Sequence, residues 1–428
     1  MQIAEKGYTH EKICAFYPVC PILWKIVGKL FPFLLERTQL LLGGFLVCNI
    51  SNTLAMVYLY KLTKAIFNSQ NFAVLTLFLY SITPASIFTM ALYTEPVFAF
   101  TSFAGMYYLF VSNNLIASTI LFMLSAGCRS NGITNALFVF IWAVSRAISL
   151  VFPLKRTSLT KFLRACFTLA FGAVSCFAIA LPTVLHEESQ FSHKCIAPTP
   201  PSLYSQFLPF EVPLLNISLA HRIIRRYAVL LHVYNPLHKI PALNNILFGG
   251  FNDTEVGKIA LREWCVVDEH GKGGSIYGFI QGAYWSVGPF RYFTLKQLPR
   301  HFMALPISLI TVCAVVSYTK HWYDLSKQKK SEKESRKNGQ TYFSFAAWPF
   351  VLHLAILFLV SYPIINIEVM TRFLNACPPI FWFVASILEG WMNSQGTKRT
   401  WLVYLLLFFF IGFAISGAIL FPMFMPWT

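Results

Sequence analysis

The chain contains 428 residues, of which 56% are hydrophobic and only 12% are charged. So few charges cannot cover the surface of a soluble globular protein of this length, which excludes that class and indicates an integral membrane protein. The formal charge of +17 would suggest nucleic-acid binding in a soluble protein. Here the basic residues stand in short segments between apolar runs, where they orient the chain and contact headgroups. We therefore expect membrane lipids, and not nucleic acid, as partners.

The chain opens on a segment without a predicted span, residues 1–39, whose first 21 residues are polar. It continues with eight apolar runs of about 20 residues, the length that crosses a hydrocarbon core of about 30 Å. The predicted spans are 40–60, 72–92, 96–112, 162–185, 302–318, 345–362, 374–390 and 401–421. This pattern predicts an all-α polytopic membrane protein that forms a single domain over residues 1–428.

Residues 115–146, between the third and fourth spans, are apolar but are interrupted by Arg129-Ser130-Asn131-Gly132. This stretch is too long for one straight helix and too short for two full spans. We therefore predict a tight helical hairpin that turns at these four residues. Counted as two crossings, the hairpin places all the basic clusters on one side, which the positive-inside rule makes cytosolic. These clusters are 61–64, 146–164, 320–337 and 398–399.

The same alternation divides the chain into a lumenal loop 1–39, spans with the hairpin over 40–185, a lumenal region 186–301 and carboxyl-terminal spans over 302–428. The lumenal region contains two N-glycosylation sequons, at Asn216 and Asn252. Because Met1 itself falls on the lumenal side, we expect a further amino-terminal segment with one more helix. Translocation of a short amino terminus is the alternative.

Five groups of polar side chains stand near span ends and helix breaks, and this topology places them all on the lumenal side. Polar groups at membrane depth are costly, so such positions are informative. The groups are Glu5, Tyr8 and Glu11; Glu95 in the turn Tyr93-Thr94-Glu95-Pro96; Arg129, Ser130 and Asn131; Gln281, Tyr284, Trp285, Arg291, Tyr292 and Gln297 in the aromatic stretch 279–299; and Arg372 in the segment 368–372. We predict that they surround one site.

Each group also has a simpler interpretation. Glu5 and Glu11 could be solvated, and Glu95 could only stabilise a helix start, since carboxylates favour amino-terminal turns. Arg129 could pair with Glu95 and never meet a substrate. The stretch 279–299 could be an interfacial helix with an aromatic belt, and Arg372 could anchor the chain at the membrane interface.

Together the groups fit sugar transfer from a lipid-phosphate donor, which cannot leave the membrane. Such transfer needs a carboxylate to take the proton of the acceptor hydroxyl and a cation to stabilise the phosphate leaving group. Glu5, Glu11 or Glu95 could be the base, and Arg129 or Arg372 could be the cation. No Asp-x-Asp motif for a divalent metal is present, which argues against a nucleotide-sugar enzyme. We expect neither a metal nor a cofactor.

A series of short motifs resembles the PIG-V family (GPI mannosyltransferase 2). The motifs are IAEKGY and AFYP, then SITPASIF and YTEPVF, then RSNG, then IQGAYWSVGPFRYFTLKQLPRHFMALP and TRFLNACPPIFWF. They occur in the family's order and span most of the chain. The resemblance implies a GT-C-type fold in the endoplasmic reticulum membrane with a lumenal active site. It also implies α-1,6 transfer of the second mannose from dolichyl-phosphate mannose to the GPI-precursor glycolipid, with inversion of the anomeric centre.

Two departures from the family pattern stand out. Family members carry a first span and a lumenal Trp-Asp a few residues before the IAE motif, and the resemblance implies that this Asp is the catalytic carboxylate. In this sequence its position would precede Met1. The second departure is an expansion between Asn235 and Cys265.

Other functions compete with this one. Another GT-C glycosyltransferase of the endoplasmic reticulum could use the same donor. A non-catalytic isoform or scaffold could keep the fold, a small membrane partner subunit could bind it, and a transporter could share its polytopic character. Transporters have no need of a long lumenal region, so the stretch 279–299 favours the enzymes.

Overall fold

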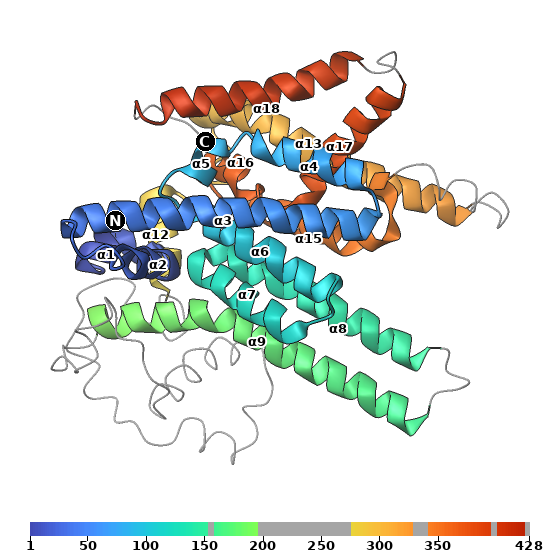
Figure 1. The fold of residues 1–428 in the computed structure, drawn as a ribbon, viewed down its shortest axis with the longest axis horizontal. Helices are drawn as coiled ribbons and strands as arrows, with labels where there is room; N and C mark the ends of the chain where they lie inside the picture. Colours follow the sequence, from blue (N-terminus) through green and yellow to red (C-terminus); the bar gives the residue numbers. More distant parts are fainter. Residues whose placement is uncertain (153–157, 196–274, 328–340, 395–399, 424–428) are drawn as a thin grey trace.

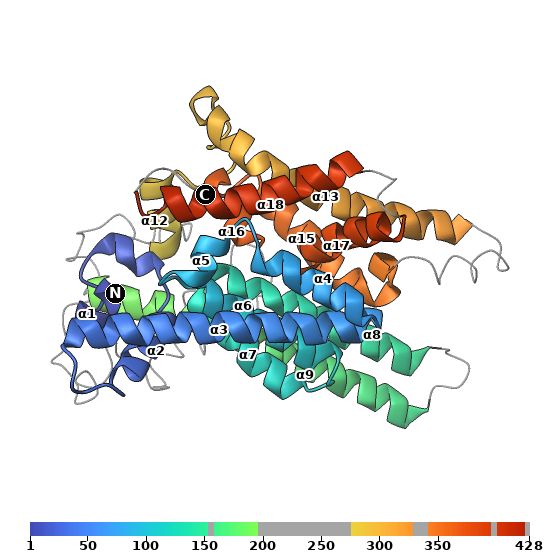
Figure 2. The same cartoon turned by 45° about the horizontal axis from the view of Figure 1, so that its top comes forward.

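The computed structural model of the protein describes residues 1–152, 158–195, 275–327, 341–394 and 400–423. Every regular element within these ranges is a helix, which confirms the predicted all-α class. The long helices run along a common direction in an elongated bundle (Figures 1 and 2). The sequons at Asn216 and Asn252, and most of the region 186–301, lie outside the described residues.

Five helical stretches of the described residues are long and apolar enough to cross a membrane. They are α3 (Glu36–Phe67), Ser130–Val151, the Leu159–Gln190 part of α9 (Leu159–Cys195), Leu295–Lys327 and α18 (Thr400–Leu420). Shorter apolar helices include α2 (Val19–Gly28), α7 (Leu115–Cys128) and the stretch Phe345–Ser361. The molecule is therefore a multi-pass membrane protein.

The amino-terminal segment is more structured than expected, because it contains α1 (Gln2–Lys6), the 3-10 helix η1 (Glu11–Ala15) and α2. We expected a loop over 1–39, since α2 is too short to register as a span. Helix α2 instead packs on α3 at a glycine contact. A Cβ atom at Gly43 would lie 2.3 Å from the Trp24 carbonyl oxygen and 2.6 Å from the Gly28 nitrogen, so only glycine permits this approach.

The predicted span 72–92 is wrong as a single helix. It consists of α4 (Gln70–Ser81) and α5 (Ser86–Met90), which are separated at Thr83-Pro84. Proline lacks an N–H group and cannot continue a helix ladder without a kink. At this break the Thr83 hydroxyl donates a hydrogen bond to the Asn375 side-chain oxygen at 2.5 Å. This break positions the turn that leads into α6 (Glu95–Phe110).

The predicted helical hairpin is confirmed. Helix α7 ends at Cys128, the 3-10 helix η2 (Ser130–Asn135) makes the turn, and α8 (Ala136–Val151) follows. A Cβ atom at Gly132 would lie 2.4 Å from the Ser125 carbonyl oxygen, so the turn folds tightly onto α7. The buried Asn135 amide donates to the Ser102 and Ser125 hydroxyls at 3.0 and 2.9 Å, which fixes the hairpin against α6.

The carboxyl-terminal part contributes the remaining helices of the bundle. It comprises α12 (Ile276–Trp285), η7 (Leu295–Gln297), α13 (Leu298–Lys327), η8 (Thr341–Phe343), η9 (Phe345–Ala347), α15 (Trp348–Ser361), η10 (Ile367–Val369), α16 (Met370–Phe373), α17 (Pro378–Asn393) and α18. The predicted span 374–390 starts later, at Pro378, because proline is favoured in the first helical turn. The fully buried Trp382 donates to the Thr63 hydroxyl at 2.8 Å and joins α17 to α3.

The ends of the long helices lie at two opposite ends of the bundle (Figure 1). The carboxyl ends of α3, α8 and α13 lie at the same end of the bundle as the amino end of α9 (Figure 1). These are the ends that carry the basic clusters of the sequence. The amino-terminal segment, α12 and the carboxyl end of α9 lie at the other end (Figures 1 and 2). The fold thus gathers elements from distant parts of the sequence at the end where the site is expected.

Candidate active site

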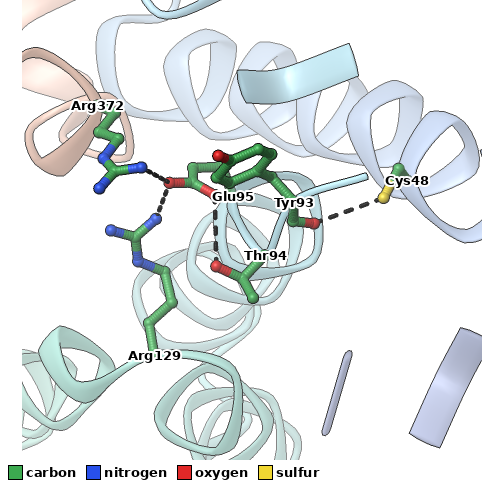
Figure 3. Close-up of polar contacts among 6 residues, drawn as sticks. All are labelled: Cys48, Tyr93, Thr94, Glu95, Arg129 and Arg372. Atoms are coloured by element: carbon green, nitrogen blue, oxygen red, sulfur yellow. Dashed lines mark hydrogen bonds and ion pairs between the residues drawn. The ribbon is translucent and has the colours of Figure 1, made fainter. Parts of the chain in front are cut away.

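Three of the predicted residues meet in one charged cluster. Glu95, in the first turn of α6, forms an ion pair with Arg129 from the hairpin turn, and the Arg372 Nη1 atom of α16 lies 3.9 Å from the same carboxylate oxygen (Figure 3). The exposed side-chain fractions are 4% for Glu95, 16% for Arg129 and 26% for Arg372. The Thr94 hydroxyl donates to the other carboxylate oxygen at 3.3 Å. Both oxygens of Glu95 are therefore engaged.

Aromatic rings hold the two guanidiniums in place. The Arg129 guanidinium lies 5.6 Å from the Phe98 ring centre, and that of Arg372 lies 5.1 Å from the Phe88 ring centre. Both separations fall in the range of cation–π attraction. The three ionic side chains together carry a formal charge of +1. A partly buried cluster of this sign favours an anion such as phosphate, which arginine binds with its planar fork.

The hairpin turn connects the charged cluster to α12. The Ser130 and Tyr277 hydroxyl oxygens lie 2.6 Å apart. Burial raises the pKa of the Tyr277 phenol, although the Ser130 hydrogen bond and the Arg129 charge act in the opposite direction. Tyr277 therefore stays protonated near neutral pH and keeps its hydroxyl hydrogen. Of the two predicted residues that follow Arg129, Ser130 is half-buried and Asn131 is buried.

Glu187, which the sequence analysis did not predict, caps the start of helix α12. The Glu187 carboxylate of α9 accepts hydrogen bonds from the backbone N–H groups of Ile276 and Tyr277, at 3.1 and 3.0 Å, and from the Ser275 hydroxyl at 3.2 Å. A carboxylate at a helix start satisfies free N–H groups and the positive end of the helix dipole. The polar run His186–Gln190 at the end of a predicted span was the available signal.

The amino-terminal segment packs on α12 from the other side. The Tyr284 hydroxyl donates to the Glu11 carboxylate at 2.9 Å, and the Trp285 ring lies edge-on to Phe16 at 6.0 Å. The Tyr8 hydroxyl donates to the Phe16 carbonyl oxygen at 2.8 Å, and burial raises the Tyr8 pKa. Glu11 and Tyr8 therefore adjoin α12. None of the ion pairs among the described residues includes Glu5, which lies in α1.

The rest of the stretch 279–299 does not form one helix. Helix α12 ends at Trp285, and a turn follows in which the Gly288 and Phe290 N–H groups donate to the carbonyl oxygens of Ile364 and Pro363. Arg300 donates to the Tyr292 hydroxyl at 3.2 Å and to the Gln297 side-chain oxygen. Tyr292 and Gln297 therefore brace the start of α13. Gln281 contributes its backbone carbonyl to the end of α12, and Arg291 packs beside Gly288.

A cavity of about 630 Å³ opens beside the hairpin turn, between α8, α9 and α15. Ser130, Asn131 and Tyr277 line its polar part. The remaining wall is mainly apolar and includes Ile133, Phe140, Leu357 and Val360, of which Ile133, Phe140 and Val360 are exposed on the outer surface of the bundle. The cavity thus leads from the apolar surface to the hairpin turn that carries Arg129. This shape suits a lipid chain with a polar head.

Comparison with known proteins decides the family, because the profile described as "Mannosyltransferase (PIG-V)" matches residues 1–428. The chain belongs to the PIG-V mannosyltransferase family. It is 27% identical over 400 residues to the GPI alpha-1,6-mannosyltransferase 2 of Mus musculus, covering 90% of this chain and 71% of the relative. It is also 27% identical over 446 residues to the GPI mannosyltransferase 2 of Drosophila pseudoobscura pseudoobscura, covering 100% and 84%.

Among solved structures, this PIG-V family chain is similar to the crystal structure of the Archaeoglobus fulgidus oligosaccharyltransferase complex with Zn and sulfate. The TM-score is 0.46 and the sequence identity is 13%, over 94% of this chain and 44% of that chain.

A second feature of this PIG-V family member that the sequence did not reveal is a part-buried polar relay of Asn131, Thr134 and His353 beside the cavity. The Thr134 hydroxyl donates to the Asn131 carbonyl oxygen at 2.7 Å and lies 3.2 Å from the His353 Nε2 atom. A hydroxyl has one hydrogen, so Thr134 accepts from His353, whose Nε2 atom must carry the proton. The His353 ring stacks on Phe138 at 4.4 Å. The relay holds the hairpin turn against α15.

Proposed function

We propose that this PIG-V family protein adds the second mannose, through an α-1,6 linkage, from dolichyl-phosphate mannose to the GPI-precursor glycolipid. The similarity of the chain to GPI mannosyltransferase 2 proteins supports this assignment. The reaction takes place at the lumenal face of the endoplasmic reticulum membrane, in a GT-C-type architecture. The observation that carries the proposal is the cluster of Glu95, Arg129 and Arg372 next to an apolar cavity.

The two arginines bind the phosphate of the donor. A mannosyl phosphate donor develops negative charge on its phosphate as the glycosidic bond breaks, and fixed guanidiniums stabilise that charge. Glu95 serves as the positioning residue, because it engages Arg129 and Arg372 at one oxygen (Figure 3). The apolar cavity beside Ser130 accepts the lipid chain of the donor, which remains in the bilayer.

The amino-terminal segment carries the proton acceptor for the attacking hydroxyl. Glu5 lies in α1 and Glu11 in the 3-10 helix η1 of that segment. Glu11 adjoins the aromatic face of α12 through Tyr284, and aromatic rings are suited to hold a sugar. The roles predict that Glu11→Gln lowers turnover and leaves donor binding intact, whereas Arg129→Ala weakens donor binding.

The test is complementation of cells that lack GPI mannosyltransferase 2 with the full-length protein. Wild type should restore surface GPI-anchored proteins. Arg129→Ala should not, and Arg129→Lys should restore them only partly, because a point charge cannot replace a bidentate fork. Protein abundance is measured in parallel. Function is compared at equal abundance, and full rescue by Arg129→Ala at equal abundance would contradict a role in phosphate binding.

A further inference from the structure

A second cleft, of about 580 Å³, lies between α3, α6, α8 and the start of α15. Arg146, Ser145 and Trp142 of α8 line it together with Trp348 of α15. Arg146 stands 15 residues after Asn131 of the candidate active site, which at 1.5 Å per helical residue is about 22 Å along the bundle. Arg146 lies in the last turns of α8, and the carboxyl ends of α8 and α3 lie at the same end of the bundle (Figure 1). The cleft is therefore a separate site.

Contacts with Trp142 and Asn113 fix the position of the Arg146 guanidinium beside this cleft. It lies 5.3 Å from the Trp142 ring centre, and its Nη1 atom donates to the Asn113 side-chain oxygen at 3.2 Å. Asn113 adopts a φ of 51° in the turn between α6 and α7, a left-handed conformation that asparagine tolerates better than most residues. Asn113 takes one of five guanidinium N–H groups. The others can point to an anion.

One side of the cleft is lined by basic and polar residues, and the other side is lined by apolar residues. None of the described residues that line the cleft is acidic, and the exposed Lys61 and Lys64 occupy the last turns of the adjoining α3. Ser145 adds an exposed hydroxyl next to Arg146. Phe110 and Ile141 form the apolar wall. Tryptophans such as Trp142 and Trp348 are enriched where membranes meet water.

We propose that this cleft binds an anionic glycerophospholipid from the leaflet on the basic side of the membrane. The lipid phosphate lies on Arg146 and Ser145, and an acyl chain lies against Phe110 and Ile141. Basic pockets between spanning helices recognise anionic headgroups in this way. The charge and the apolar wall together select an amphiphile over a free anion. The site does not depend on the proposed catalytic role of Arg129.

The experiment measures lipid binding to the purified full-length protein in phosphatidylcholine nanodiscs, with and without phosphatidylserine. Melting temperature and native mass spectrometry are the two readouts. Phosphatidylserine should raise the melting temperature of wild type and stay bound in the mass spectrum. One basic residue near an anionic membrane surface changes binding roughly fivefold, so Arg146→Gln should weaken phosphatidylserine binding by about that factor. Arg146→Lys should retain part of it.

The matched control is Arg164→Gln, because Arg164 is an exposed arginine of α9 that does not line the cleft. It should bind phosphatidylserine as wild type does. Equal losses in both glutamine variants would overturn the proposal and leave only diffuse surface attraction. Equal stabilisation by inorganic phosphate would overturn the lipid as the ligand, and no preference for phosphatidylserine over phosphatidylcholine in wild type would overturn the site itself.

Discussion

Replacing Glu95 with glutamine removes the carboxylate that two guanidiniums share. Arg129 is partly buried, with 16% of its side chain exposed, so the change leaves its guanidinium without its ion-pair partner. Breaking a buried ion pair by removing one partner costs about 3–5 kcal/mol. A loss of that size lowers the steady-state abundance of a membrane protein several-fold. We therefore expect Glu95→Gln to lose both abundance and mannosyl transfer.

The double variant Glu95→Gln/Arg129→Gln separates stability from catalysis. It removes the unpaired charge, so abundance and melting temperature should return toward the wild-type values, while transfer stays absent because Arg129 is missing. Immunoblotting measures abundance, and flow cytometry of surface GPI-anchored proteins measures transfer. The matched control changes the exposed neighbours Glu36 and Arg37 of α3 to glutamine, which should alter neither. Restored transfer in the double variant would refute the catalytic role and leave the pair purely structural.

Three further changes test the surrounding structure. Gly132→Ala should disrupt the hairpin turn and lower the melting temperature, because its Cβ would lie 2.4 Å from a backbone oxygen, whereas Gly390→Ala, with nothing within 4 Å, should not. Glu187→Ala should loosen α12 at a typical capping cost of about 0.5–2 kcal/mol, seen as faster proteolysis within α12, and unchanged cleavage would contradict the capping role. Thr134→Val and His353→Phe should each lower the stability of the protein by about 0.5–1.5 kcal/mol, the net contribution of one hydrogen bond, measured as a lower melting temperature. Their effects should not add in the double variant, and full additivity would refute the relay.

The sequence predicted the helical class and most span positions, because apolar length is a strong signal. It failed where a local break or a short helix mattered. Pro84 interrupts an apolar run that hydropathy alone reads as continuous, and α2 is shorter than a span but packs at Gly43. Such features depend on single residues and tertiary contacts rather than on average hydropathy.

The candidate site was predicted in part. The possible pairing of Glu95 with Arg129 follows from their places at neighbouring span ends, but the third partner, Arg372, stands 277 residues from Glu95 in the sequence, and no local pattern links them. Glu187 was missed because Ile276, which it contacts at the start of α12, stands 89 residues later in the sequence. The His353 relay was missed because a lone histidine in an apolar run usually signals packing. The sequence did not predict these contacts because the residues that make them lie far apart along the chain.

Mannosyl transfer by microsomes tests the central claim most directly. Membranes from cells that lack GPI mannosyltransferase 2 receive the full-length protein, tritiated dolichyl-phosphate mannose and a GPI precursor that carries one mannose. The account predicts that wild type yields a precursor with a second mannose that an α-1,6-specific mannosidase removes, and that Arg129→Ala at equal abundance yields none. Equal product from Arg129→Ala, or no elongation by abundant wild-type protein, would contradict it.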